Sequence, residues 1–469
     1  MFAKIQRIHF VGIGGIGMSG IAEVLLNLGY KVSGSDLKSS AVTQRLASLG
    51  ATTFEGHAAE HVQGADVVVT SSAVAADNPE VAEARKQHIP VIPRAEMLAE
   101  LMRLKYGIAI AGMHGKTTTT SMVAAVLAAG GLDPTVVVGG RVDAMGSNAR
   151  LGKSQYLVAE ADESDRSFLK LSPILSVVTN IDREHMDCYR NMRDVKQTFL
   201  DFMDRVPFYG MVVACNDDPI LRRLLTQVQR RVLTYGTRRG SDFLIKPGTI
   251  EPQPGEHRPL SHFRVSYRGK HLDDFTLRVP GAHNILNATA AIAVGIGLDL
   301  SVESIRAALQ NFHGVDRRFQ LRGQAAGVSV IDDYGHHPTE IKATLAAARQ
   351  CGFKKVHVIF QPHRYTRTKS LIEEFAQAFH DADSLAVLDI YAASEHPIEG
   401  ISGEVLALRI QEAHQQTVRY VRSFAEAAEI VSGEAQEGDM ILTLGAGSVS
   451  QLGPVILERL QQRVAVGSA

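Results

Sequence analysis

Residues 112–118, Gly112-Met113-His114-Gly115-Lys116-Thr117-Thr118, are the stretch that decides the fold class of this chain. They follow an apolar run at 107–111 and precede an alanine-rich helical pattern at 121–127. A strand, a glycine turn and a helix in this order form a phosphate cradle, because backbone N–H groups and the positive helix end converge on phosphate oxygens. In such a cradle Lys116 reaches the terminal phosphates and the Thr117 hydroxyl binds Mg²⁺. The stretch therefore predicts a nucleoside triphosphate site in an α/β unit.

The spacing of this loop departs from the usual eight-residue pattern, since Ile110 stands where the first glycine belongs. An ordinary strand–helix turn is the alternative interpretation. It explains the two glycines but not the Lys-Thr-Thr that directly follows them, so the phosphate cradle is the better hypothesis.

The composition of the chain favours a globular enzyme. A length of 469 residues is too great for one core and indicates two or three domains. The net charge of −1 argues against a protein held to nucleic acid or membranes by charge. No apolar run reaches the roughly 18 residues of a membrane span, no signal-peptide pattern opens the sequence, and the three scattered cysteines indicate no disulfide framework. We expect a cytoplasmic protein.

A second glycine-rich turn lies near the start of the sequence. Residues 12–17, Gly-Ile-Gly-Gly-Ile-Gly, follow a predicted strand at 8–11, and a strand at 31–35 ends in Asp36, 24 residues after the first glycine. This pattern is the fingerprint of a dinucleotide-binding unit. Further strands are expected at 66–70 and 90–92, with a boundary near 100–107.

Apolar runs predict two further α/β units. In the second unit we expect strands at 107–111, 156–159, 175–179 and 211–215, β-rich segments at 263–267 and 275–279, and a helix at 285–296. In the third we expect strands at 328–331, 356–360, 385–390 and 440–444, with helices at 340–349 and 371–379. Alternation of strands and helices is typical of parallel sheets. The predicted domains are 1–105, 106–319 and 320–469.

Two acidic clusters follow predicted strands of the second unit. Residues 160–165 contain four acids, and residues 179–187 include Asp182, Glu184 and His185. Ligands of open parallel sheets bind beyond the carboxyl ends of the strands, and phosphate chemistry needs Mg²⁺ ligands there. Solvated polar turns are the alternative, but the Lys116 loop in the same unit favours a metal site.

The third unit has two polar clusters of another kind. Residues 332–338, Asp-Asp-Tyr-Gly-His-His-Pro, and 361–368, Gln-Pro-His-Arg-Tyr-Thr-Arg-Thr, each follow a strand. Arginine forks match carboxylates, so the two clusters predict a site for a small anion. A metal site at His336 and His337 is a weaker alternative, because adjacent residues rarely converge on one ion. Another alternative is structural: the polar side chains of these clusters would only provide hydrogen-bond partners for buried polar groups.

Seven motifs of the chain, taken together, resemble those of the Mur ligases and occur in the same order. They are residues 12–19, 112–118, 160–165, 281–287, 332–338, 361–368 and 445–450, which span nearly the whole chain. Within that family the chain resembles the ligases that attach L-alanine to UDP-N-acetylmuramate. A threonine commonly stands where this chain has Met113, but the backbone N–H that a phosphate cradle uses is retained.

This resemblance implies an α/β enzyme of three domains: a Rossmann-like N-terminal domain for the UDP-sugar, a P-loop ATPase-like central domain for ATP, and a Rossmann-like C-terminal domain for the amino acid. The implied reaction is ATP-dependent ligation of L-alanine to the lactyl carboxylate of UDP-N-acetylmuramate through an acyl phosphate, in peptidoglycan precursor synthesis. Two Mg²⁺ ions are expected, with Mn²⁺ as an alternative ion. The expected partners are these small molecules, not nucleic acid or a membrane, and the protein is expected to be a monomer or homodimer.

The resemblance also implies roles for individual residues. The expected catalytic residues are Lys116, Glu160, His185, Arg318 and Asp333. The expected ATP-binding residues are Gly112, Met113, His114, Gly115, Lys116, Thr117, Thr118, His283, Asn284, Asn287 and Arg318, and the expected metal ligands are Thr117, Glu160 and His185. The expected UDP-sugar contacts are Gly15, Ile16, Gly17, Ser19, Asp36, His57, Ser71 and Ser72. The expected amino-acid contacts are Tyr334, His336, Arg364 and Arg367.

Three other functions remain open at this point. An NAD-dependent oxidoreductase would account for residues 12–17 and Asp36 but not for the Lys116 loop. A nucleotide switch or binding ATPase would leave the clusters of the third unit without a role. A recycling ligase, which attaches a tripeptide to the same sugar nucleotide, differs from this chain around residues 14–18 and 334–335.

Overall fold

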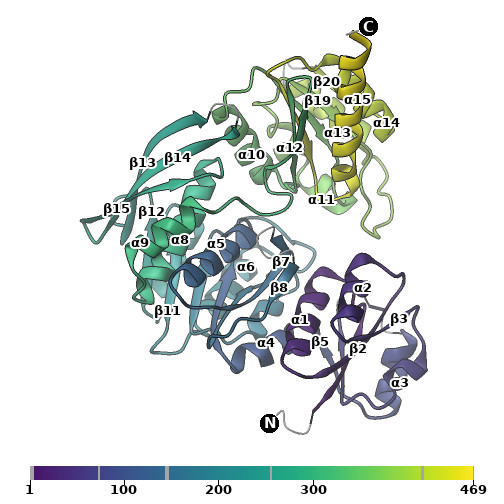
Figure 1. Cartoon of the computed structure of the whole chain (residues 1–469), viewed down its shortest axis with the longest axis vertical. Helices are drawn as coiled ribbons and strands as arrows, with labels where there is room; N and C mark the ends of the chain where they lie inside the picture. The colour runs from purple at the N-terminus through teal and green to yellow at the C-terminus, as the bar shows by residue number, and fades with distance from the viewer. Residues whose placement is uncertain are drawn as a thin grey trace. The chain divides into compact units, whose positions relative to one another are not determined.

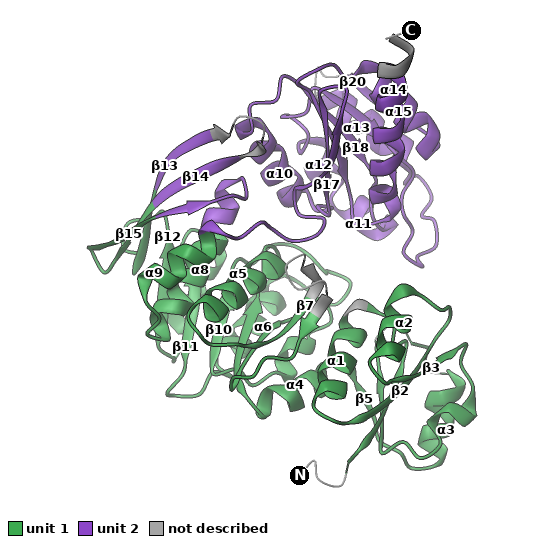
Figure 2. Ribbon diagram, viewed as in Figure 1, with its two compact units in different colours: residues 1–246, 264–274, 286–309 green, residues 247–263, 275–285, 310–469 purple. Residues whose placement is uncertain are grey.

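A computed structural model describes residues 5–71, 74–75, 77–142, 147–253, 256–413 and 417–467. Within them the chain forms three sheets surrounded by helices (Figure 1), which confirms the α/β class. The residues group into two compact units (Figure 2): one contains 1–246, 264–274 and 286–309, and the other 247–263, 275–285 and 310–469. The predicted domain limits at 105 and 319 stay a prediction.

The first sheet is parallel and has the strand order β3-β2-β1-β4-β5. Its strands are β1 (Arg7–Val11), β2 (Lys31–Asp36), β3 (Thr52–Glu55), β4 (Val67–Thr70) and β5 (Val91–Pro93). Its helices are α1 (Ile16–Asn27), α2 (Ala41–Ser48), α3 (Pro79–Lys86) and α4 (Arg94–Arg103). The chain moves outward from β1 in both directions, so the order reverses between β1 and β4, which is where ligands bind in open α/β sheets. The polar strand β3 was not predicted.

The second sheet has the strand order β15-β14-β13-β12-β11-β10-β6-β9-β7-β8. Its strands are β6 (Tyr106–Ala111), β7 (Thr135–Val142), β8 (Ser147–Arg150), β9 (Tyr156–Glu160), β10 (Leu175–Val178), β11 (Met211–Cys215), β12 (Val232–Gly236), β13 (Phe243–Gln253), β14 (Glu256–Tyr267) and β15 (Lys270–Leu277). Its helices include α5 (Lys116–Ala129), α6 (Met192–Met203), α7 (Pro219–Leu224), α8 (Ala282–Gly297) and α9 (Val302–Gln310). Strand β6 pairs in parallel with β9 on one side and β10 on the other, so the loops after these three strands share one edge.

The third sheet has the strand order β16-β17-β21-β18-β19-β20 and is parallel except for β16. Its strands are β16 (Gln320–Ala325), β17 (Val328–Asp333), β18 (Val356–Phe360), β19 (Ser384–Val387), β20 (Thr417–Tyr420) and β21 (Met440–Leu444). Its helices are α10 (Pro338–Gln350), α11 (Tyr365–Ser370), α12 (Ile372–Ala376), α13 (Gly403–Ala413), α14 (Phe424–Glu434) and α15 (Leu452–Gly467).

Two predicted elements of this sheet differ from the structure. The helix expected at 371–379 is shorter in the structure: α12 begins after Leu371, which separates it from α11, and ends at Ala376. The Ser370 hydroxyl and the Leu371 N–H both donate to the carbonyl of Arg367, and such side-chain bonding competes with a continuous helix. The strand expected at 385–390 ends at Val387, because the chain then turns to place Tyr391 beside His363.

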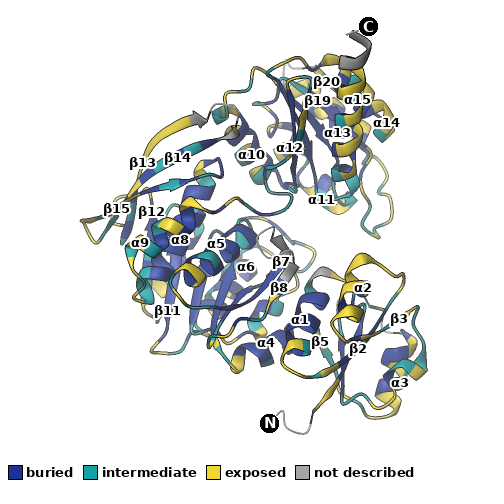
Figure 3. Cartoon of the chain, viewed as in Figure 1, coloured by how far each residue is buried: buried dark blue, intermediate teal, exposed yellow. Residues whose placement is uncertain are grey.

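The central strands of all three sheets are buried, whereas many helices expose one face (Figure 3). Burial on both faces explains the continuous apolar runs that made these strands recognisable in the sequence. Among the described helices, none combines the length and apolarity that crossing a membrane requires.

Candidate active site

The phosphate loop joins β6 to α5, as the sequence predicted. Gly112 and Gly115 have φ angles of +136° and +82°, a region in which other residues are strained. Met113 donates its N–H to the Asn180 carbonyl at 3.3 Å, and His114 donates its N–H to the Asn180 side-chain oxygen at 2.9 Å. Two of the loop N–H groups are therefore engaged by Asn180. The N–H groups in the first turn of α5 lack helical acceptors, so we expect these to be the ones that face a phosphate.

Lys116 folds back onto this loop. Its ammonium donates to the carbonyls of Gly112 at 2.8 Å and Met113 at 3.2 Å, and it pairs with the carboxylate of Glu163 at 2.7 Å. Burial opposes the charge of the ammonium group, but Glu163 and Glu160 outweigh burial and raise the pKa of Lys116 above its usual range. Lys116 is therefore a permanent, oriented positive charge at the loop.

Thr117 and Glu160 form the core of the predicted metal site. The Thr117 hydroxyl donates to the two carboxylate oxygens of Glu160 at 3.2 and 3.0 Å. Thr117 lies in the first turn of α5, the helix after β6, and Glu160 ends β9, the neighbouring parallel strand, so the shared sheet edge brings the two together. A hydroxyl and a carboxylate are the oxygen ligands that Mg²⁺ prefers.

His185, the third expected metal ligand, lies on the loop after β10. Its ring Nε2 is 3.6 Å from Glu163 and 3.8 Å from Glu184, and its φ of +54° is uncommon for a residue other than glycine. Unusual backbone angles are concentrated at functional sites, but the metal-binding role expected of His185 stays a prediction. Burial raises the pKa of Glu163, and the attraction of Lys116 opposes that shift.

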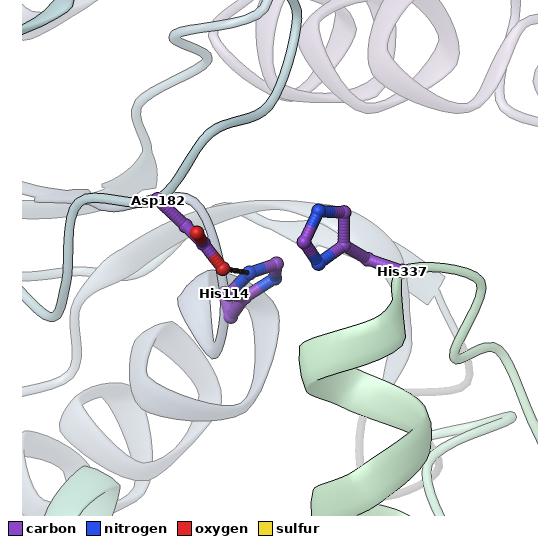
Figure 4. Close-up of side chains that lie close together, drawn as sticks. All are labelled: His114, Asp182 and His337. Atoms are coloured by element: carbon purple, nitrogen blue, oxygen red, sulfur yellow. Dashed lines mark hydrogen bonds and ion pairs between the residues drawn. The ribbon is translucent and has the colours of Figure 1, made fainter. Parts of the chain in front are cut away.

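His114 of the same loop pairs with Asp182, as Figure 4 shows. Nε2 of the imidazole lies 3.0 Å from the Asp182 carboxylate, and Nδ1 lies 3.8 Å from Glu184. The His114 carbonyl accepts hydrogen bonds from Thr179 at 2.7 Å and from Asn180 at 2.9 Å. The loop after β10 therefore fixes both the side chain and the backbone of His114. His337, also drawn in that view, is the N-cap residue of α10 in the other unit.

The close approach at Gly112 gives a testable prediction. A Cβ at this position would overlap the Thr179 hydroxyl and lie 3.1 Å from the Asn180 N–H. We expect Gly112→Ala to lower stability by about 2–3 kcal/mol and to disturb ATP use, because both overlap and positive φ oppose the side chain. Gly131→Ala is the matched control, since its φ is +81° but no atom lies within 4 Å of the added Cβ. Equal thermal unfolding of the two variants would show that the overlap is unimportant.

The residues expected near adenine begin α8. Asn287 lies against the phosphate loop, since a Cβ on Gly115 would be 2.7 Å from its side-chain oxygen. Asn284 is buried and donates to the Pro280 carbonyl at 2.7 Å. Burial, followed by the charge of Arg318, lowers the pKa of His283 to about 4, so this imidazole is neutral at physiological pH.

The UDP-sugar residues expected in the first sheet surround its glycine turn. Asp36 accepts the N–H of Gly14 at 2.8 Å, and a Cβ on Gly17 would overlap the guanidinium of Arg94. Arg94 in turn pairs with Asp162 at 3.2 Å. Gly15 precedes α1, Ile16 begins it, Ser19 is buried in its first turns, and His57 and Ser71 follow β3 and β4. Ser72 lies outside the described residues.

Asp333 shapes the loop that carries the expected amino-acid site. Its buried carboxylate accepts the N–H groups of Phe319 and Gly335, both at 2.7 Å, and the Thr344 hydroxyl at 3.3 Å. Burial raises the pKa of Asp333, with Arg318 opposing that shift. Because its oxygens are engaged by the protein itself, Asp333 holds the loop in place, and the catalytic role expected of it stays a prediction.

Tyr334 and Arg318 lie side by side at the end of β17. The guanidinium carbons of Arg317 and Arg318 are 4.9 and 5.2 Å from the centre of the Tyr334 ring. Arg318 also bonds to Glu340 at 3.5 Å, and His336 donates its N–H to the same carboxylate at 3.1 Å. The expected residues Tyr334, His336 and Arg318 therefore share one cluster, to which Arg317 and Glu340 also belong.

His363 contacts Arg367, one of the two arginines expected to hold the amino acid. It stacks on Tyr391 with ring centres 5.6 Å apart, and its Nδ1 accepts from Arg367 at 3.1 Å. Burial, then the charges of His336, Arg367 and Arg364, lower the pKa of His363 to about 3, so it stays neutral. A neutral acceptor orients the Arg367 guanidinium group without neutralising its charge, so the charge remains available to a bound anion.

Sequence reasoning did not single out several residues of these clusters. They are Arg94, Asn180, Glu163, Arg317, Glu340, His363 and Tyr391. Glu163 and His363 belong to two of the motifs used above, and each lies within three positions of a residue that was given a role. This closeness in sequence was the signal that could have identified them. No local signal marks Arg94 or Tyr391, because their partners are distant in the sequence.

Three family models match the chain. They are the Mur ligase family, catalytic domain, over residues 7–106; the Mur ligase middle domain, over 110–295; and the Mur ligase, glutamate ligase domain, over 317–447. The chain belongs to the Mur ligase family.

Relatives agree with this assignment over the full length. A UDP-N-acetylmuramate–L-alanine ligase of Koribacter versatilis is 71% identical, covering 99% of both chains. One of Acidobacterium capsulatum is 63% identical, covering 99% of this chain and all of the relative. The crystal structure of UDP-N-acetylmuramate-alanine ligase MurC from Thermotoga maritima has a TM-score of 0.81 at 30% identity, covering 97% and 99% of the two chains. A murein peptide ligase from Psychrobacter arcticus, at 23% identity and a TM-score of 0.69, shares the fold.

Proposed function

We propose that this protein ligates L-alanine to the lactyl carboxylate of UDP-N-acetylmuramate, with conversion of ATP to ADP and phosphate, in peptidoglycan precursor synthesis. The observation that carries the proposal is 71% identity over 99% of both chains to a ligase of that name. The phosphate loop with Lys116, Thr117 and Glu160 supports it, because it supplies the charge and the oxygen ligands that phosphoryl transfer needs.

The proposed reaction has two steps. A carboxylate is a poor acyl donor and must first be activated. A lactyl carboxylate oxygen attacks the γ-phosphorus of ATP, and the bond from this phosphorus to the bridging oxygen breaks. ADP departs, and the lactyl group is now an acyl phosphate. The alanine amine then attacks the acyl carbon, the C–O bond to phosphate breaks, and the nitrogen loses its proton. The enzyme would hold the amine beside the acyl carbon, so the attack takes place within one complex and does not require a random encounter between two molecules.

Residues at the edge of the second sheet are proposed to serve the first step. Lys116 contacts the phosphates from the end of its loop, and Thr117 with Glu160 forms one Mg²⁺ site, while His185 belongs to a second. The hydroxyl and carboxylate oxygens of the first site fit Mg²⁺, with Mn²⁺ as an alternative ion. The bound ions would neutralise charge on the transferred phosphoryl group.

The third sheet is proposed to hold the amino acid. Arg364 and Arg367 would bind its carboxylate, with Tyr334 and His336 as walls of the pocket. The neutral His363 supports this role, since it fixes Arg367 at 3.1 Å. Whether the protein acts as a monomer or a homodimer stays a prediction.

An assay of ADP release with UDP-N-acetylmuramate and different amines tests the proposal. We expect L-alanine to be used best and glycine about fivefold less efficiently, because one buried methyl group contributes about 1 kcal/mol. Omission of the sugar nucleotide is the control and should abolish ADP release. ADP release with L-alanyl-γ-D-glutamyl-meso-diaminopimelate but not with L-alanine would instead identify a recycling ligase.

A further inference from the structure

Glu80, on α3, is a fully buried carboxylate among three histidines, and no role proposed so far uses it. Its oxygens lie 2.7 Å from Nδ1 of His61, 3.3 Å from Nδ1 of His57 and 3.7 Å from Nε2 of His9. The Ser35 hydroxyl donates to the same carboxylate at 2.5 Å. A charged group without exposure to solvent is retained in a fold only where it is thoroughly paired.

Ser35 connects this cluster to the glycine turn of the first sheet. Its carbonyl accepts the N–H groups of Gly12 at 2.8 Å and Ile13 at 2.9 Å. Its hydroxyl contacts Glu80 and, at 2.9 Å, Nδ1 of His57. The position of one buried serine therefore determines both the glycine turn and the orientation of His57.

The hydrogen bonds also determine which nitrogen of His57 carries a proton. A serine hydroxyl has one proton, and Ser35 gives it to Glu80, which as a carboxylate can only accept. The Ser35 oxygen must then accept from His57, which places the proton on Nδ1. In the neutral imidazole Nε2 is left as an acceptor, suited to the N–H or O–H donors of a uridine.

The charge state of Glu80 is consistent with this order. Burial alone would raise the pKa of the carboxyl group, but the contacts with His9, Ser35 and His61 outweigh burial and lower it to about 2. Glu80 is therefore an anion at physiological pH and remains the acceptor for Ser35.

We propose that Glu80 is a positioning residue for the sugar nucleotide, which acts through Ser35 to set the glycine turn and the hydrogen-bonding face of His57. This inference rests on the proposed function, because it concerns the binding of UDP-N-acetylmuramate. His57 lies directly beyond the carboxyl end of β3, where ligands of parallel sheets bind, and 18% of its side chain is exposed.

Glu80→Gln tests the inference with little change in volume. The amide NH₂ can donate to Ser35, whose hydroxyl would then donate a hydrogen bond to Nδ1 of His57. The single proton of the neutral imidazole would therefore lie on Nε2, which becomes a donor. We expect the Kd and KM for UDP-N-acetylmuramate to rise about tenfold, as for one lost buried hydrogen bond, while kcat and the KM values for ATP and L-alanine change less than about twofold. Glu83→Gln, one turn along the same helix, is the matched control and should behave as wild type.

A second pair of variants separates positioning from folding. Ser35→Ala removes the hydroxyl but leaves the contacts of Glu80 with His9 and His61. It should also raise the Kd for UDP-N-acetylmuramate, and it tests the inference even if the Glu80→Gln protein does not fold. In a double-mutant cycle Glu80→Gln should add little to the effect of His57→Ala.

An unchanged Kd for the sugar nucleotide in both variants, equal increases in all three KM values, or additive effects with His57→Ala would overturn the inference. Wild-type protein that releases no ADP with UDP-N-acetylmuramate and L-alanine would overturn the proposed function instead. The two failures are therefore distinguishable.

Discussion

Lys116→Ala is expected to lower kcat for ADP release on the order of a thousandfold while the protein remains folded. The ammonium group is buried at the phosphate loop and paired with Glu163 at 2.7 Å, so it is oriented before any substrate binds. Removal of one oriented charge from a water-excluded site has effects of this size on a charged transition state. Steady-state kinetics together with circular dichroism measure the effect, and the exposed Lys270→Ala is the control.

The same substitution is expected to destabilise the protein, because Glu163 would lose its partner while still buried. Loss of one member of a buried ion pair destabilises a protein by about 3 kcal/mol. Lys116→Ala combined with Glu163→Gln should recover much of this stability without recovering turnover. Near-normal turnover of the single variant would remove the phosphate loop from the mechanism.

The phosphate loop was predictable because its signals are local. A strand, two glycines and Lys116-Thr117 follow one another, and Glu160 ends a neighbouring apolar run. Which acid of residues 160–165 faces which partner was not predictable from spacing. The chain turns sharply after β9, with Ser164 bonded back to Asp162 at 3.0 Å, and this turn places Glu160 at Thr117 but Glu163 at Lys116.

The Glu80 cluster shows a different limit of sequence reasoning. His9, Ser35, His57, His61 and Glu80 belong to segments up to 71 positions apart, and only the parallel order of the first sheet brings them together. Glu80 itself stands in a polar, helix-forming segment that is typical of an exposed surface. Its burial depends on tertiary packing, which no local pattern records.

Backbone strain at Arg364 was equally invisible in the sequence. Arg364 has a φ of +70° and precedes α11; its N–H donates to the Tyr391 carbonyl at 2.9 Å, and its carbonyl accepts from Thr368 at 2.8 Å. A residue other than glycine in this region is strained by about 1–3 kcal/mol, and such strain is concentrated at functional sites. The fold therefore keeps an arginine at a position that glycine would occupy with less strain.

Substitutions at Arg364 should separate its side chain from its backbone. Arg364→Ala and Arg364→Gly are both expected to raise the KM for L-alanine about a hundredfold, through loss of a charged fork, with little change in the KM for ATP. Arg364→Gly should nevertheless be more stable than Arg364→Ala by about 1 kcal/mol, because glycine adopts a positive φ without strain. Arg364→Lys should fall between wild type and alanine, since it keeps the charge but loses the fork.

Arg268→Gly is the matched control for this series, because Arg268 also has a positive φ, of +49°, in the turn between β14 and β15. It should leave the KM for L-alanine unchanged. Thermal unfolding and the two KM values together distinguish the two roles of Arg364. Relief of backbone strain changes only the stability, whereas loss of carboxylate binding changes only the KM for L-alanine. If the KM for ATP rises instead, Arg364 serves the nucleotide, and the amino-acid carboxylate must be bound elsewhere.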